Sequence, residues 1–184
     1  MDLYRANTNL YRGADGVPYA LTRPTAHEPA FTLEKYARSE AVLGAYGGQM
    51  ASFDWTFSPR GSNGQPLPLF NRDSGEVDPK VAAYWCENYD IAHIIVRDWM
   101  RLKPDLDGKI HLTVGTADTY YLDGPARGLD AALRSVGAKS DFRYLPGKNH
   151  DDLYAEGDDL NALLKRIAWE IYAQARPDAK HPIS

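Results

Sequence analysis

The stretches KIHLTVGTAD (109–118) and DFRYLPGKNH (141–150) decide the fold of this chain. Each begins with a short run of apolar, β-branched or aromatic residues and then turns at glycine or proline, a pattern typical of buried strands. Between them, residues 123–136 place leucine, valine and alanine at helical spacing, with Asp123 as the expected cap and Gly137 at the left-handed stop position. Strand, helix and strand in this order predict two parallel strands joined by a helical crossover.

Two further helical patterns surround this unit. From Pro79, behind the expected cap Asp78, aromatic and aliphatic residues recur at three- and four-residue steps until Lys103-Pro104 ends the run. Its aromatic residues are expected to pack on the sheet. A last helix is predicted over 158–176, before Pro177. Its expected inward residues are Leu160, Leu163, Leu164, Ile167, Ile171 and Ala175. Residues 77–184 are therefore predicted to form an α/β unit, a parallel sheet flanked by helices.

Residues 1–76 have a less regular sequence pattern than the rest of the chain and are predicted to form an irregular, lid-like segment with one helix. Thr32 is the expected cap of that helix, which should run to about Tyr46 and stop at Gly47-Gly48. The following stretch, 58–75, is rich in glycine, proline, serine and asparagine, which favours a structured surface loop.

Composition excludes several classes of function. The chain has 184 residues, with 21 basic and 25 acidic side chains and a formal net charge of -4. Because the cations are not clustered, no nucleic-acid partner is expected. No apolar run approaches the ~20 residues that cross a bilayer, and the first residues do not predict a signal peptide, so no membrane partner is expected. The compartment stays open, because an upstream segment could carry a signal peptide. The single cysteine, Cys86, excludes an internal disulfide and a multi-cysteine metal site.

A candidate site follows from the lengths of the crossover helix and the strands. A helix of about 14 residues and a strand of about six cover similar distances, so both strands should end at one edge of the sheet. Asp118 and His150 then lie on adjacent loops at the carboxyl edge, where such sheets hold catalytic groups. A carboxylate that accepts from one imidazole nitrogen leaves the other as a general base. Two plainer readings remain: Asp118 as a cap or turn residue, and His150 as a solvated histidine paired with Asp151 or Asp152.

At this point the sequence resembles a known family. The matching residues are Trp85, Tyr89-Asp90-Ile91, Trp99, Gly108 to His111, Gly115 to Leu122 and Leu145 to His150. They resemble the closing part of the α/β-hydrolase fold in the esterase family that includes enterochelin-esterase-like and esterase D-like serine hydrolases. The resemblance covers about residues 78–176. It implies a partial α/β-hydrolase-type sheet, Asp118 as the acid and His150 as the base of a catalytic triad, a small-molecule ester substrate, and no metal or organic cofactor.

The nucleophile of such a triad is missing from this sequence. Hydrolases of this kind carry serine in a Gly-x-Ser-x-Gly elbow before the acid and the histidine. The upstream serines lack those flanking glycines: Ser39, Ser52, Ser58, Ser62 and Ser74. Ser52 is expected to serve loop packing, and Cys86 sits in an apolar helix, where a free thiol acts as a small core residue. A metal site built on Asp90, His93 or His111 lacks a third ligand at suitable spacing.

Two hypotheses follow. In the first, the chain is the C-terminal portion of a serine hydrolase for carboxylic esters, inactive by itself because the serine lies in sequence not given. In the second, it is a non-catalytic α/β-hydrolase-like module used for binding or assembly. Both predict self-association or a partner that covers the open sheet edge. Tyr120 and Tyr121 either line the mouth of the site or cover the edge of the sheet.

Overall fold

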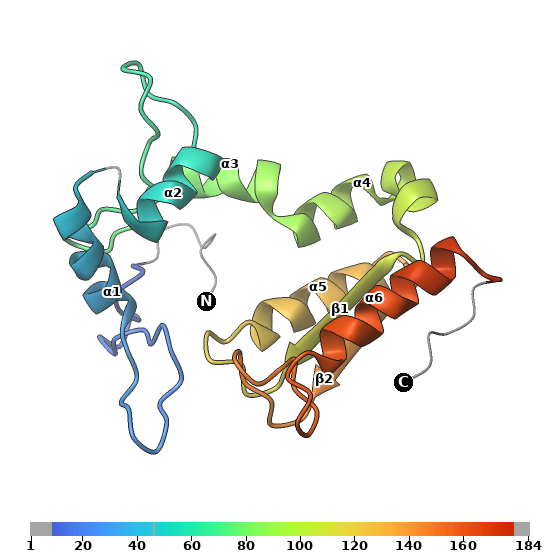
Figure 1. Ribbon diagram of the computed structural model, residues 1–184. Helices are drawn as coiled ribbons and strands as arrows, with labels where there is room; N and C mark the ends of the chain where they lie inside the picture. The colour runs from blue at the N-terminus through green and yellow to red at the C-terminus, as the bar shows by residue number, and fades with distance from the viewer. Residues whose placement is uncertain (1–8, 46, 179–184) are drawn as a thin grey trace.

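The computed structural model of the chain describes residues 9–45 and 47–178. The first residues, on which the signal-peptide prediction rests, lie outside these ranges. Figure 1 shows a group of short N-terminal helices joined by α3 and α4 to a small sheet with its own helices. The elements, in chain order, are α1 (Leu33–Glu40), the 3-10 turn η1 (Ala41–Leu43), α2 (Gly48–Phe57), α3 (Pro79–Tyr89), α4 (Ile91–Leu106), β1 (Ile110–Gly115), α5 (Asp123–Ser135), β2 (Ser140–Leu145) and α6 (Ala162–Ala175).

The sheet has the predicted strands in the predicted orientation. β1 and β2 pair in parallel, with Ile110 opposite Ser140 and Gly115 opposite Leu145. Because both strands have six residues and no offset, they end at the same edge. Figure 1 shows α5 and α6 on either side of this sheet. Within the two described ranges no further strand pairs with either edge, so the chain forms a small parallel sheet with helices, compatible with part of an α/β fold.

A hydrophobic core fixes α4 and α5 against the sheet. Its buried members are Ile95, Trp99 and Leu133, and Phe142 of β2 packs against them. Leu133 has 0% of its surface exposed. Gly137 follows α5 with a positive φ of 69°, as expected for a left-handed stop.

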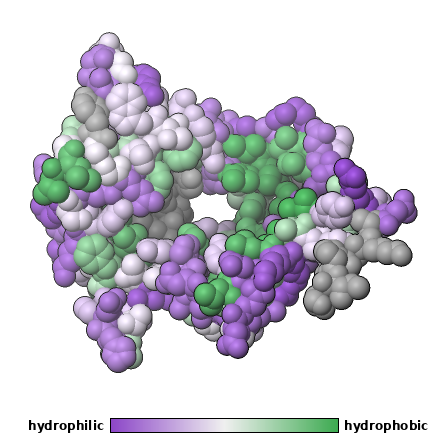
Figure 2. Space-filling model, viewed as in Figure 1, coloured by the Kyte–Doolittle hydropathy of each residue, from purple (hydrophilic) through white to green (hydrophobic). Residues whose placement is uncertain are grey.

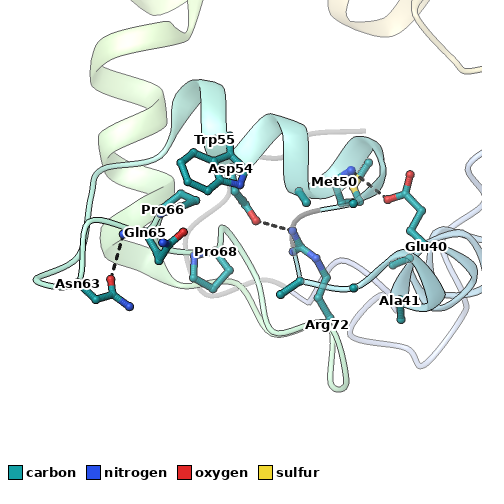
Figure 3. Close-up of a pocket in the computed structure, with 15 residues that line it drawn as sticks. Glu40, Ala41, Met50, Asp54, Trp55, Asn63, Gln65, Pro66, Pro68 and Arg72 are labelled. Carbon is teal, nitrogen blue, oxygen red and sulfur yellow. Dashed lines mark hydrogen bonds and ion pairs between the residues drawn. The ribbon is translucent and has the colours of Figure 1, made fainter.

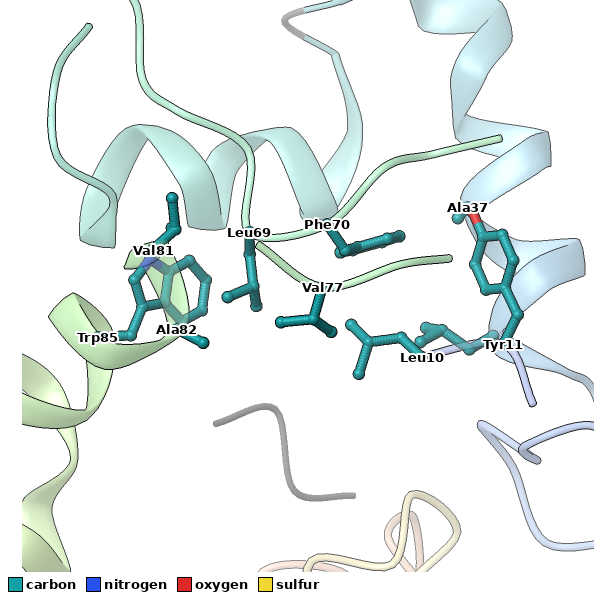
Figure 4. Packing of buried hydrophobic residues seen from close by; sticks show 10 residues of the cluster. Leu10, Tyr11, Ala37, Leu69, Phe70, Val77, Val81, Ala82 and Trp85 are labelled. Carbon is teal, nitrogen blue, oxygen red and sulfur yellow. The ribbon is translucent and has the colours of Figure 1, made fainter. Parts of the chain in front are cut away.

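A separate core holds the N-terminal helices and α3 together (Figure 4). It contains Leu10, Leu33 and Val81, and the indole of Trp85 donates a 2.9 Å hydrogen bond to the hydroxyl of Ser58. The prediction that Trp85 packs on the sheet is therefore wrong. This core joins residues on both sides of position 76, while the division of the chain into segments 1–76 and 77–184 stays a prediction.

The N-terminal region contains a helix that the sequence pattern did not predict. Thr32 caps α1 as expected, but α1 ends at Glu40, and Tyr46, the expected end, lies outside the described residues. Glycines 47 and 48, expected only as a stop, begin α2, which includes Ser52. The carboxylate of Glu40 accepts from the N–H groups of Gln49 and Met50. Because this cap comes from the preceding helix, no local capping residue marks the start of α2.

The long helix predicted from Pro79 is two helices. Asp90 has extended backbone, and its carboxylate accepts from the N–H of His93, so it caps the start of α4. Pro104 does not stop α4, which continues to Leu106, and the N–H of Asp107 bonds the carbonyl of Lys103. Proline here removes only one bond of the last turn.

The last helix starts later and buries less than predicted. α6 begins at Ala162, and only Leu163 of its residues is fully buried. The expected inward residues Leu160, Leu164 and Ile171 are 71%, 47% and 66% exposed. A sheet of two strands offers α6 too narrow a face to cover its apolar side. No helix of the described chain has the length and apolar character to span a membrane.

Candidate active site

Hydrogen bonds tie the loops after β1 and β2 together. The N–H of Thr116 bonds the carbonyl of Leu145 at 2.9 Å, and the N–H of Gly147 bonds the Thr116 hydroxyl at 2.9 Å. One step further, the N–H of Ala117 bonds the carbonyl of Lys148 at 3.0 Å. The parallel pairing thus continues past the strand ends and brings the loop after β1 next to the loop after β2.

Gly115 permits this close approach. A Cβ atom at this position would lie 2.0 Å from the carbonyl oxygen of Lys148, far inside van der Waals contact. Any other residue here would push the two loops apart. Packing therefore requires glycine at this position of the Gly-x-x-Asp pattern, because a residue with a Cβ atom does not fit against the Lys148 carbonyl.

Asp118 and His150 meet at this edge, as the sequence predicts. The Nδ1 atom of His150 lies 2.9 Å from Oδ2 of Asp118. The aspartate side chain is 3% exposed and the histidine side chain 46% exposed. The buried partner is thus the carboxylate, and the imidazole reaches from it toward solvent.

A tight turn supplies the other partners of the Asp118 carboxylate. Its Oδ1 atom accepts from the N–H groups of Tyr120 at 2.9 Å and Leu122 at 3.0 Å. Tyr121, between these two donors, has a φ of 61°. Tyr121 is left-handed and Leu122 is right-handed, and this reversal of the backbone brings the two N–H groups to one carboxylate oxygen, as in the backbone concavities that bind anions. The turn after β1 is built to hold a negative charge.

The hydrogen bonds keep Asp118 ionised. Burial acts to raise the pKa of its carboxyl group, but the Leu122 N–H, the His150 imidazole and the Tyr120 N–H together lower this pKa below its ordinary value. An ionised carboxylate only accepts, so the proton of a neutral His150 resides on Nδ1. The lone pair of Nε2 is then available as a general base.

The two simpler interpretations, Asp118 as a cap or turn residue and His150 as a solvated histidine paired with Asp151 or Asp152, have different outcomes. Asp118 is a turn residue as well, since its carboxylate bonds Leu122, the N-cap of α5. The Asp118 carboxylate can therefore hold the turn and bind His150 at the same time. One acidic neighbour of His150 has another partner: Asp152 accepts from the N–H of Asn149. In the described chain, the carboxylate bonded to the His150 ring is that of Asp118.

No family model, curated protein or solved structure matches this chain. The chemistry of the pair follows from its own geometry and surroundings.

The two tyrosines after Asp118 have different surroundings. The ring of Tyr120 meets the His150 ring edge-on, with centroids 4.9 Å apart at 90°. Tyr120 is half-exposed and covers one side of the imidazole, so it lies at the solvent-facing side of the Asp118–His150 pair. The ring of Tyr121 instead lies under the guanidinium of Arg23, 4.2 Å from the ring centroid.

Arg23 contacts the site, although no sequence pattern predicts this contact. Its N–H bonds the carbonyl of Thr119, its Nε bonds the carbonyl of Asp118, and its Nη2 pairs with Asp123. Asp123, expected as the cap of α5, is the first residue of that helix instead, and Leu122 holds the cap position. Arg23 lies in a segment without periodicity or motif, so no sequence pattern points to it.

Three of the candidate serines have hydrogen-bond partners other than His150. The hydroxyls of Ser39 and Ser52 bond carbonyls within their own helices, and that of Ser58 accepts from Trp85. Within residues 9–45 and 47–178, no serine hydroxyl is bonded to the His150 ring. Among these residues there is also no group of three or more side chains placed to hold a metal ion.

Two of the cavities lined by described residues lie in different parts of the fold. The first, of about 450 Å³, lies between α1, α2 and the loop around Pro66, with the Asp54–Arg72 ion pair in its wall (Figure 3). Its lining residues all come from positions 37–72, none of them on the loops of Asp118 and His150. The second, of about 420 Å³, is mostly apolar and lies between the start of α4, β1 and α5. Leu122 of the Asp118 turn lines this second cavity.

Proposed function

We propose that this chain is the C-terminal portion of a serine hydrolase of the α/β-hydrolase type, acting on carboxylic esters. Asp118 is the acid and His150 the general base of its triad. One observation carries the proposal: an ionised, buried carboxylate bonds one nitrogen of an exposed imidazole where two parallel strands end. The serine comes from a part of the enzyme outside the sequence given.

The proposed reaction proceeds through an acyl-enzyme. The serine hydroxyl attacks the ester carbonyl carbon while Nε2 of His150 takes its proton. The protonated imidazole, held by Asp118, then donates that proton to the departing alkoxide, which leaves as the alcohol. A water molecule attacks the acyl group and passes a proton to Nε2, and the carboxylic acid departs as the serine recovers its proton. Asp118 remains ionised throughout, so the low pKa of its carboxyl suits this role.

The first experiment uses the chain as given. A fluorophosphonate probe, which phosphonylates activated serines, should label none of its serines. Labelling of any of them would contradict the assignment of the nucleophile to another segment.

The second experiment restores the missing part. The DNA upstream of Met1 is read for an in-frame strand followed by Gly-x-Ser-x-Gly, and the extended protein is expressed. Its hydrolysis of p-nitrophenyl esters should fall by about 10⁴-fold or more in His150→Gln, the scale of loss when a triad member is removed. An extended protein with equal activity in His150→Gln overturns the triad. The absence of an in-frame elbow would favour the second candidate function.

That second candidate is a non-catalytic binding or assembly module. The observation that favours it is uncovered apolar surface: Ile91, Met100 and Ile171 are exposed, and Figure 2 shows hydrophobic side chains gathered over α4 and beside the hollow next to the sheet. Such surface, together with unpaired strand edges, promotes association with another chain. A stable, inactive complex formed by the extended protein would support this function over the first.

A further inference from the structure

We propose that Arg23 is a positioning residue for the Asp118–His150 pair, and that it makes the N-terminal segment part of the site. The catalytic consequence of this role rests on the proposed function, whereas the contacts between Arg23 and the Asp118 turn are independent of it. Arg23 and Asp118 are 95 positions apart in the chain.

The contacts of Arg23 cover the whole turn after β1. The Nε atom donates to the backbone carbonyl of Asp118 at 2.9 Å, and the N–H of Arg23 donates to the carbonyl of Thr119 at 2.8 Å. The Nη2 atom donates to the carboxylate of Asp123 at 2.9 Å. The guanidinium plane also lies over the Tyr121 ring. The planar fork of arginine makes the Nε bond, the Nη2 bond and the ring contact together, which lysine could not reproduce.

The turn needs such support because it contains a residue in an unfavourable conformation. Tyr121 has a positive φ without being glycine, and such a residue persists only where its surroundings over-determine it. That conformation places the N–H of Leu122 at Oδ1 of Asp118, beside the N–H of Tyr120. Relaxation of Tyr121 would therefore withdraw the Leu122 donor and loosen the hold on the carboxylate.

The direction of the carboxylate in turn fixes His150. The bond from Nδ1 to Oδ2 of Asp118 orients the imidazole, whose ring also meets Tyr120 edge-on and is otherwise half in solvent. Arg23 thus acts on His150 through Asp118, without touching the imidazole itself. The adjacent backbone of Leu21 and Thr22 bonds the carbonyl of Phe31, so the segment that carries Arg23 is itself held in a loop.

The test is an NMR measurement on the full chain, which requires no catalysis. The Nδ1–H proton of His150 is observed at low field, and its exchange with solvent is measured. In Arg23→Gln the exchange rate should rise about tenfold or more, the factor that corresponds to one lost hydrogen bond to a charged group. Arg23→Lys should give an intermediate rate. Arg12→Gln is the matched control: Arg12 lies in the same N-terminal region and pairs with Glu34 at the surface, so its loss should leave the rate unchanged.

A wild-type exchange rate in Arg23→Gln overturns the proposal. If Arg23→Gln does not fold, Arg23→Lys decides, and a wild-type rate in that variant has the same meaning. The two proposals can fail separately. If the His150–Asp118 hydrogen bond depends on Arg23 but the extended protein has no esterase activity, only the hydrolase function is contradicted. If the extended protein is active but this hydrogen bond is unaffected by Arg23→Gln, only the positioning role is contradicted.

Discussion

The Nδ1 atom of His150 lies 2.9 Å from Oδ2 of Asp118, across 32 residues of chain. The same carboxylate collects two backbone N–H groups at its other oxygen. One buried charge therefore closes the turn after β1 and orients an imidazole from the loop after β2. The stability of the turn and the orientation of the imidazole therefore depend on the same carboxylate, so a change at Asp118 should affect both.

The first prediction concerns Asp118→Asn. The amide keeps one oxygen but places a neutral group opposite three donors, so the free energy of unfolding should fall by about 1–3 kcal/mol. The His150 proton should no longer be fixed on Nδ1, which the ¹⁵N shifts of the ring nitrogens report. Asp151→Asn is the control, because Asp151 is exposed beside His150 and loses the same charge. Equal losses of stability in both variants would remove the special role of Asp118.

The second prediction is a pH dependence. Burial raises the pKa of the Asp118 carboxyl, but the hydrogen bonds outweigh it, so the folded protein holds this proton less tightly than the unfolded chain. The stability contributed by Asp118 is then present above 3.8, its ordinary value, and is lost as the pH falls through the lower, folded value. Urea unfolding of wild type and Asp118→Asn should show a difference that narrows on acidification. A constant difference would contradict the low pKa.

The sequence predicted the sheet well because local signals and parallel geometry agree there. Both strands, the stop at Gly137 and the meeting of Asp118 with His150 follow from strand length, glycine position and the crossover. The loops then have little freedom, since Gly115 admits the backbone of Lys148. The esterase assignment itself stays a proposal.

Features that depend on distant partners escaped prediction. The start of α2 is capped by Glu40 of another helix, and Trp85 finds Ser58 across the N-terminal core. Arg23 reaches the Asp118 turn from a segment without periodicity. α6 looked like a core helix because its apolar spacing is regular, but spacing does not reveal how much sheet there is to cover it.

The third prediction concerns association through α6. Ile171 is 66% exposed on this helix, and an uncovered apolar face favours contact with another chain. Ile171→Glu should shift sedimentation of the purified chain toward the monomer, with at most about 0.5 kcal/mol of change in unfolding. Gln174→Glu, on an exposed position of the same helix, introduces the same charge and should leave association unchanged. A chain that is monomeric at all concentrations before mutation would exclude this surface as an interface.

The last prediction tests the close approach of the two loops. In Gly115→Ala the new methyl group would meet the carbonyl of Lys148 at 2.0 Å, and backbone cannot yield as a side chain does. We expect a loss of about 1–3 kcal/mol in the free energy of unfolding from overpacking. The loop of His150 should also move away from Asp118, so the low-field Nδ1–H signal should weaken. The matched control is Gly128→Ala: Gly128 lies inside α5 with open space around its Cβ position, so alanine should stabilise the helix by about 0.5–1 kcal/mol. A stable Gly115→Ala variant with an intact Nδ1–H signal would show that the strand ends are not held as closely as the hydrogen bonds between their loops indicate.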